Sequence, residues 1–137
     1  MAVVEQLIRA EENGGISFGN HLLQEKQKKE DFEYAGDVYK VKTFQTMTKL
    51  EKNGMFLYES EPGTSVFCFV ETEEGVSFLV EGTEDAQITV GLQEDTEYDV
   101  KIGAEDAGKM RTNLGGKLSL SVELSGYEEA VAVKISR

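Results

Sequence analysis

The chain has 137 residues, with 26 acidic and 14 basic side chains and a formal net charge of −12 at pH 7. This length suffices for one ordinary domain or two very small ones, and the charge argues against binding to nucleic acid or to anionic membrane surfaces. The single cysteine, Cys68, excludes an intrachain disulfide and a cysteine-based zinc site.

The N-terminal stretch AVVEQLIRAEE, residues 2–12, is partly apolar, but it contains Glu5 and has no basic region before it. It does not have the features of a signal peptide or of a membrane span, so we expect a cytoplasmic protein. Four of its apolar residues would share one face of a helix: Val3, Val4, Leu7 and Ile8. A similar stretch later in the chain is β-rich, so we favour a strand that closes a hairpin through residues 12–15.

Residues 20–37, NHLLQEKQKKEDFEYAGD, are ambiguous, because their charged first half fits a short helix, a long loop or an exposed strand. Further along the chain, short apolar runs are separated by turns at Asn53-Gly54, Pro62-Gly63 and Glu74-Gly75. Many short strands with glycine-rich turns are typical of a sandwich or a barrel.

The clearest alternation of apolar and polar residues lies in the second half of the chain. It predicts strands at 97–102, 117–124 and 131–136. The apolar positions of these strands are Tyr98, Val100, Ile102, Leu118, Leu120, Val122, Leu124, Val131, Val133 and Ile135. Each strand should therefore have one buried face and one solvated face.

The sequence also repeats itself. Four segments match in the same order: 11–18 with 71–78 (EENGGISF and ETEEGVSF), 39–42 with 98–101 (YKVK and YDVK), 49–58 with 109–120, and 66–70 with 131–135. We therefore predict an all-β protein of two tandem duplicated β-sandwich-like modules, residues 1–72 and 73–137, with short antiparallel strands and Gly-rich hairpin turns. The alternative is that the matches only reflect sequence features common to β-hairpins.

The two copies differ on one face of their predicted sheets. By alignment, the first copy should bury Phe56, Tyr58, Val66, Cys68 and Val70. On its opposite face, Phe44, Met55, Leu57, Phe67 and Phe69 stand where the second copy has Gly103, Lys117, Ser119, Ala132 and Lys134. A large apolar face needs a cover, so we predict an oligomer or domain interface at these five apolar residues. Residues 1–35 folding over the face, or a ligand groove, are the alternatives.

Motifs for catalysis or cofactor binding are weak. His21 is the only histidine, so His21 and Cys68 form the one Cys–His pair available, and a buried, inert Cys68 is the better interpretation. The acidic runs lack the spacing of a calcium loop, and no phosphate-binding glycine motif occurs. We predict no metal and no cofactor. There is no tryptophan, and Tyr127 is the one tyrosine clearly free to stack on a sugar.

Residues 37–66, 80–100 and 108–124 carry a resemblance to a known group. Over nearly its whole length, including GISFGN at 15–20, the chain resembles small acidic proteins of anaerobic gut bacteria that are often called endosialidases. The name implies cleavage of polysialic acid within the chain by a large β-propeller enzyme, and sialidases hold the substrate carboxylate with clustered arginines. This chain is too short for several propeller blades. It has three arginines, Arg9, Arg111 and Arg137, so no catalytic residue is carried over.

The sequence therefore favours a non-catalytic β-protein that self-associates as a homo-oligomer, in a structural or assembly role. The alternative is a protein that binds carbohydrate or cleaves it as an endosialidase would. Neither interpretation involves nucleic acid or a membrane.

Overall fold

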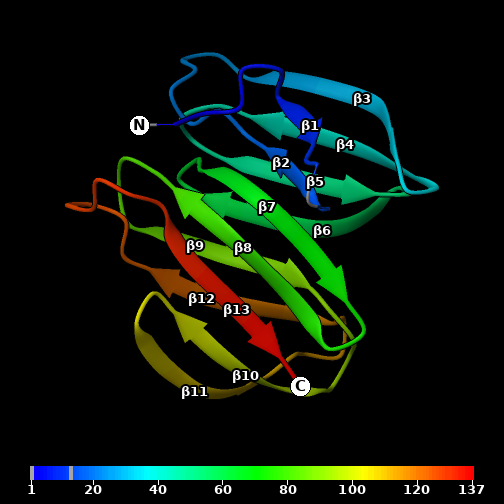
Figure 1. The fold of residues 1–137 in the computed structure, drawn as a ribbon, viewed down its shortest axis with the longest axis vertical. Helices are drawn as coiled ribbons and strands as arrows, with labels where there is room; N and C mark the ends of the chain where they lie inside the picture. Colours follow the sequence, from blue (N-terminus) through cyan, green and yellow to red (C-terminus); the bar gives the residue numbers. More distant parts are fainter. Residues whose placement is uncertain (1, 13) are drawn as a thin grey trace.

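The computed structural model describes residues 2–12 and 14–137, and it is all-β, as predicted (Figure 1). The described residues form thirteen strands and no helix. The strands build two antiparallel sheets that pack as a β-sandwich. None of the described segments is a helix long and apolar enough to cross a membrane.

Sheet A has seven strands and sheet B has six. In spatial order, sheet A contains β1 (Ile8–Ala10), β2 (Ile16–Phe18), β7 (Ser65–Thr72), β8 (Gly75–Glu81), β13 (Val131–Ser136), β10 (Glu97–Ile102) and β11 (Glu105–Arg111). Sheet B contains β12 (Lys117–Val122), β9 (Ala86–Gly91), β6 (Met55–Glu61), β5 (Thr48–Lys52), β4 (Asp37–Thr43) and β3 (Gln27–Tyr34). Figure 1 looks onto sheet A, with β9 and β12 of sheet B behind it.

The core lies between the sheets and follows the predicted alternation in the second half. Leu118, Leu120 and Val122 of β12 are buried, as are Val133 and Ile135 of β13. The centre of the core is aromatic: the rings of Phe18, Tyr58, Phe69 and Phe78 contact one another at centroid distances of 5.2 to 6.2 Å, mostly edge to face. Such contacts add to the stabilisation from burial alone.

Both halves of the chain contribute strands to both sheets. The boundary expected between residues 72 and 73 falls in the turn of the β7–β8 hairpin, where Thr72 pairs with Gly75. In sheet B, β6 of the first half pairs with β9 of the second. Residues 1–72 and 73–137 therefore share one sandwich rather than each forming its own pair of sheets.

Matched segments nevertheless have matched local structure. β2 pairs with β7, and β8 pairs with β13 in the same way, with Gly15 and Gly75 at corresponding positions. Both glycines have positive φ, +84° and +151°, and a Cβ there would lie 2.7 Å from the Phe69 carbonyl oxygen or 1.9 Å from that of Ile135. The repeated YKVK and YDVK segments differ in their placement, since β4 lies in sheet B and β10 in sheet A.

A β-bulge in β7 reverses the facing expected for part of the first copy. Phe67 pairs with Leu79 and Val70 pairs with Ser77, so two residues of β7 stand opposite Phe78 of β8. Cys68 has a φ of +55° and is exposed, while Phe69 turns into the core. The prediction of a buried Cys68 is therefore wrong.

A second irregularity, between β5 and β6, acts in the same way. Leu50 pairs with Tyr58 and Glu51 pairs with Phe56, so Leu57 is the extra residue, and it is buried. The prediction that Leu57 lies on the outer face is therefore wrong. The prediction for Phe69 is wrong for the same reason, because a bulge turns each side chain into the core. Tyr58 and Val66 are buried as predicted.

The two ambiguous segments are both extended. The N-terminal stretch contains a short strand, β1, that pairs with β2 in a hairpin; residue 13, in the expected turn, lies outside the described residues. Residues 27–34 form β3, which is the edge strand of sheet B and is mostly exposed. Of the three interpretations of residues 20–37, the exposed strand is confirmed for this part.

Candidate interaction surface

The structure does not bring the five predicted interface residues to one face. Leu57 and Phe69 are in the core. Phe44 is half-buried in the loop after β4, with the Lys26 Nζ atom 5.8 Å from its ring centroid, and Met55 is 72% exposed at the start of β6. Both belong to the sheet B side, whereas Phe67 is half-buried in sheet A. Of the five predicted residues, only Phe67 therefore lies on the outer face of sheet A.

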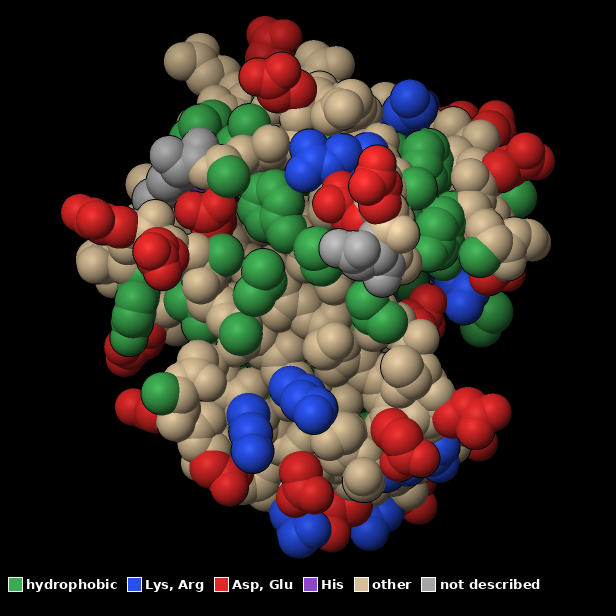
Figure 2. Space-filling model, in the orientation of Figure 1, with side chains coloured by type: hydrophobic (Ala, Val, Ile, Leu, Met, Phe, Trp, Pro, Cys, Tyr) green, Lys and Arg blue, Asp and Glu red, His purple; other side chains and the backbone are tan. Residues whose placement is uncertain are grey.

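Phe67 belongs to a row of small and apolar residues that crosses the outer face of sheet A. It pairs with Leu79 of β8, and Leu79 pairs with Ala132 of β13. The row continues to Gly103, whose N–H donates to the Ala132 carbonyl at 2.7 Å. We call these four residues the apolar row: Phe67, Leu79, Ala132 and Gly103. Figure 2 shows hydrophobic side chains gathered over the upper half of this face, whereas charged side chains dominate the lower half.

Charged residues flank the apolar row. Lys134 lies two residues after Ala132, and Lys101 lies two residues before Gly103. The two lysines are direct cross-strand partners, and both are exposed. On the other side of the row β8 continues to Glu81, whereas Glu105, at the start of β11, pairs with Ile102, which faces the core side. Asp106 of β11 stands directly opposite Lys101, so the lysine side of the row also carries an exposed acidic residue.

A hollow of about 580 Å³ lies beside Gly103 and Ala132. It lies between the β10–β11 turn and the loop from β12 to β13, and Glu105, Glu123, Glu129 and Tyr127 are among its lining residues. Tyr127 is 54% exposed, as predicted for a free tyrosine. No ion pair joins these three carboxylates to any of the described residues.

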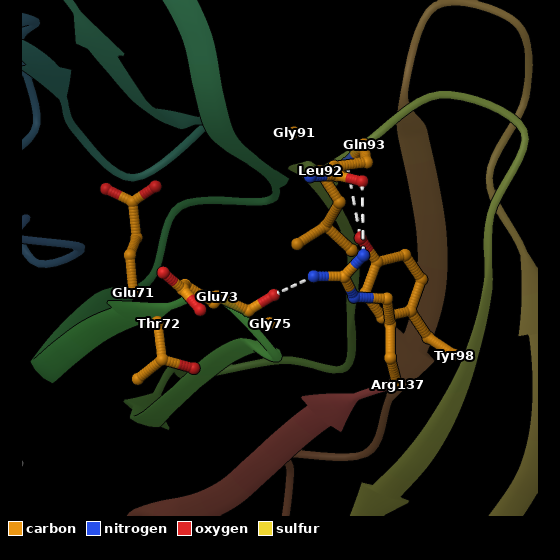
Figure 3. Close-up of a pocket in the computed structure, with 9 residues that line it drawn as sticks. All are labelled: Glu71, Thr72, Glu73, Gly75, Gly91, Leu92, Gln93, Tyr98 and Arg137. Atoms are coloured by element: carbon orange, nitrogen blue, oxygen red, sulfur yellow. Dashed lines mark hydrogen bonds between the residues drawn. The ribbon is translucent and has the colours of Figure 1, made fainter.

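A second hollow, of about 500 Å³, lies where β7 and β8 turn beside the end of β9 (Figure 3). The Arg137 guanidinium crosses it, donating to Gln93 Oε1 at 3.3 Å and to the Glu73 carbonyl. The Tyr98 hydroxyl accepts a hydrogen bond from the Gln93 N–H at 3.2 Å. These polar groups bond with one another, so this hollow holds a local structural network rather than a set of free ligand-binding groups.

His21 and Cys68 form hydrogen bonds with other residues rather than with each other. His21 is buried, and its Nδ1 lies 2.7 Å from the Oγ of Ser65, which is fully buried. Burial lowers the pKa of the imidazole below its ordinary value of 6.5, because the charged form loses solvation. The N–H of Cys68 donates to Ser17 Oγ at 3.0 Å. A nucleophile needs a base beside it and must be accessible to a substrate. Ser65 is fully buried, so it is not accessible.

The interior of the described chain offers no preformed polar site. No buried side-chain nitrogen or oxygen among the described residues lacks a hydrogen-bond partner. Burial raises the pKa of the Tyr58 phenol, whose hydroxyl bonds to Thr64 Oγ1 at 2.8 Å. Within residues 2–12 and 14–137, no three His, Cys, Asp or Glu side chains are grouped so that they could hold a metal ion.

Comparisons with protein-family models, with curated proteins and with solved structures find no match. The candidate surface therefore rests on the geometry of the chain itself.

Sequence reasoning missed most of the residues that define this surface. Leu79, Ala132 and Gly103 were not among the predicted interface residues, because all five predicted residues belong to the first copy. The alternation of β8, with Val76, Phe78 and Val80 buried, already places Leu79 outside. The available signal was thus a large apolar residue on the solvated side of a regular strand.

Proposed function

We propose that this protein is a non-catalytic β-sandwich that self-associates through the outer face of sheet A, in a structural or assembly role. One observation carries the proposal: Phe67 and Leu79, direct cross-strand neighbours, lie on the solvated face of a strongly acidic protein. Leu79 remains 39% exposed.

Burial of these side chains would stabilise an interface. Full burial of a Leu or Phe side chain contributes about 1.5–3 kcal/mol relative to an exposed one, and both residues still have surface left to bury. A stable interface needs more than about 1,000 Å² in total. The contact must therefore extend beyond the apolar row to the polar positions around it.

Substitution of the row tests the proposal. Phe67→Lys and Leu79→Lys place a charge in the interface, so we expect each variant to lose association while its far-ultraviolet circular dichroism stays that of the parent. Met55→Lys is the matched control, because Met55 is an exposed apolar residue on the sheet B side. Loss of association in the control, or none in the two row variants, would overturn the proposal.

Cys68 provides a second readout that needs no substitution. It is the single cysteine, it is exposed, and it follows Phe67 directly in β7. If the face is covered by association, alkylation of the thiol should slow as the protein concentration rises. A rate independent of protein concentration would contradict coverage of this face.

A carbohydrate-binding role is the second candidate, and Tyr127 favours it. An exposed aromatic ring beside a hollow with free carboxylates offers a stacking surface and acceptors for sugar hydroxyls. This candidate predicts saturable binding to a polysaccharide on a glycan array, abolished by Tyr127→Ala. Absence of a signal across the array would leave self-association as the one supported role.

A further inference from the structure

Four strands stand at the ends of the two sheets of the described chain, and β12 is the one with a long and regular free edge. β1 has only three residues, while β3 and β11 are largely charged and pair irregularly with their neighbours. β12 has six residues in unbroken register with β9, and Lys117 is its one charged residue. Proteins usually shorten, charge or distort an exposed strand edge, because its backbone groups pair with other chains. β12 therefore lacks the protection that the other three edges have.

The free edge of β12 presents unpaired backbone groups. The Lys117 N–H donates to Asn113 Oδ1 at 3.0 Å, and the Lys117 carbonyl accepts a hydrogen bond from the Asn113 N–H at 3.1 Å. Both groups of Lys117 thus point away from β9. Successive residues of an antiparallel strand bond to opposite sides, so the N–H and C=O groups of Ser119 and Ser121 point the same way. No described residue bonds to the backbone of these two serines on that side.

A hollow lies on the free side of β12. Sheet A has one strand more than sheet B, and in Figure 1 β10 and β11 lie beyond β12. The β10–β11 hairpin lines the hollow of about 580 Å³ together with Ser121 and Glu123 at the end of β12. Ile102 and Met110 of this hairpin pack against the core but are only half-buried. A seventh strand of sheet B would therefore lie over this hairpin and cover more of their surface.

The charges around the hollow favour a basic occupant. Glu105, Glu123 and Glu129 line it and are exposed, and none of them is in an ion pair with a described residue. Glu123 continues the outward-facing positions of β12, so it would stand beside the outward side chains of an added strand. Glu105 pairs with Ile102 and shares its face. Complementary charge of this kind fixes register and excludes wrong partners.

We propose that β12 binds an extended segment of another protein as a seventh strand of sheet B, with apolar residues at alternate positions and Lys or Arg between them. The backbone of the segment pairs with Ser119 and Ser121, its apolar side chains cover Ile102 and Met110, and a basic side chain faces Glu123. In this mode of recognition the main chain supplies affinity and the alternate side chains supply specificity. The regular N–H and C=O groups of a strand edge match another backbone, which favours a peptide over a carbohydrate at this hollow.

Selection from a phage-displayed library of random peptides, about nine residues long so that they span β12, tests the partner on the full chain. We expect the enriched peptides to have apolar residues at every second position and at least one Lys or Arg between them. A synthetic copy of an enriched peptide should bind Glu123→Lys at least tenfold more weakly than the parent. No enrichment, or enriched peptides without a basic residue, would overturn the proposal.

A proline at the free edge tests the backbone pairing. Ser119→Pro removes the outward N–H and leaves the bonds between β12 and β9, since an edge strand tolerates proline where its N–H faces solvent. Ser119→Ala is the matched control, because both variants lose the contact of the serine hydroxyl with Thr89 Oγ1 at 3.0 Å. We expect Ser119→Ala to bind the peptide as the parent does and Ser119→Pro to bind at least tenfold more weakly. Equal binding by the two variants would contradict pairing at β12.

Amide hydrogen exchange followed by NMR gives a readout that needs no substitution. The N–H groups of Ser119 and Ser121 should exchange at least tenfold more slowly when the peptide saturates the protein. Peptide binding that is lost in Tyr127→Ala but leaves both exchange rates unchanged would place the peptide elsewhere in the hollow and overturn the proposal. Leu79→Lys should bind the peptide as the parent does, because β12 belongs to sheet B. A failure of self-association and a failure of peptide binding are therefore separate results.

Discussion

At the scale of single residues, Phe67 and Phe69 have opposite roles although they stand two positions apart in one strand. A regular strand would place both on the same face. The bulge at Cys68 turns Phe69 into the core at 3% exposure and leaves Phe67 outside, half-buried.

We therefore expect Phe69→Ala to lower the free energy of unfolding by about 3–5 kcal/mol, as for large-to-small changes in a core. Phe67→Ala should cost far less in the separated chain and should act mainly on self-association. Urea denaturation at nanomolar concentration, followed by fluorescence, compares the two. Similar losses in both variants would show that the bulge does not divide their roles.

His21 makes the stability of the protein depend on pH, because its imidazole is buried. Its pKa in the folded chain is lowered by burial, so the unfolded chain binds more protons once the pH falls below about 6.5. Its stabilising contribution is complete above that pH and is lost as the pH falls through the unfolded pKa toward the folded one.

We expect the urea concentration at the unfolding midpoint of the parent to be lower at pH 5.5 than at pH 7.5. The decrease should be smaller for His21→Gln. Both proteins contain the same carboxylates, so the difference between them isolates the imidazole. Parallel pH profiles would contradict the assignment of His21 as a buried neutral group.

At the scale of elements, Gly75 shows how the duplication constrains the turn between β7 and β8. A Cβ at this position would lie 1.9 Å from the Ile135 carbonyl oxygen of the neighbouring strand. Gly126 also has a positive φ, +85°, but a Cβ there meets nothing within 4 Å. The two glycines therefore separate steric exclusion from backbone strain.

Gly126→Ala should cost about 1 kcal/mol, from the strain of positive φ alone. Gly75→Ala should cost at least twice as much, roughly 2 kcal/mol or more, because β8 must move away from β13. Thermal denaturation of both variants measures the difference. Equal costs would mean that the backbone relaxes around the new Cβ.

The elements also show where sequence reasoning succeeds. The strands at 97–102, 117–122 and 131–136 were predictable because regular alternation fixes which residues face the core. In β6 and β7, the extra residues Leu57 and Cys68 shift the alternation by one. Nothing in the local sequence marks those bulges, since Cys68 is neither glycine nor asparagine, so the facing of Phe69 could not be predicted.

At the scale of the whole molecule, the duplication predicted the strands but not their assembly. β4 and β10 carry the same motif, YKVK and YDVK, and bury the same tyrosine, Tyr39 and Tyr98, yet they lie in different sheets. Pairing between distant strands depends on contacts that alternation does not encode. Sheet A consequently brings Phe67 of the first half beside Leu79 and Ala132 of the second, and this creates the candidate surface.

The central claim is that this surface holds copies of the chain together, and native mass is its most direct test. Light scattering behind size exclusion, at micromolar concentration, should give a whole multiple of the chain mass of 15.2 kDa for the parent and 15.2 kDa for Leu79→Lys. A parent that elutes as a single copy, or a Leu79→Lys variant that keeps the mass of the parent, would contradict the account.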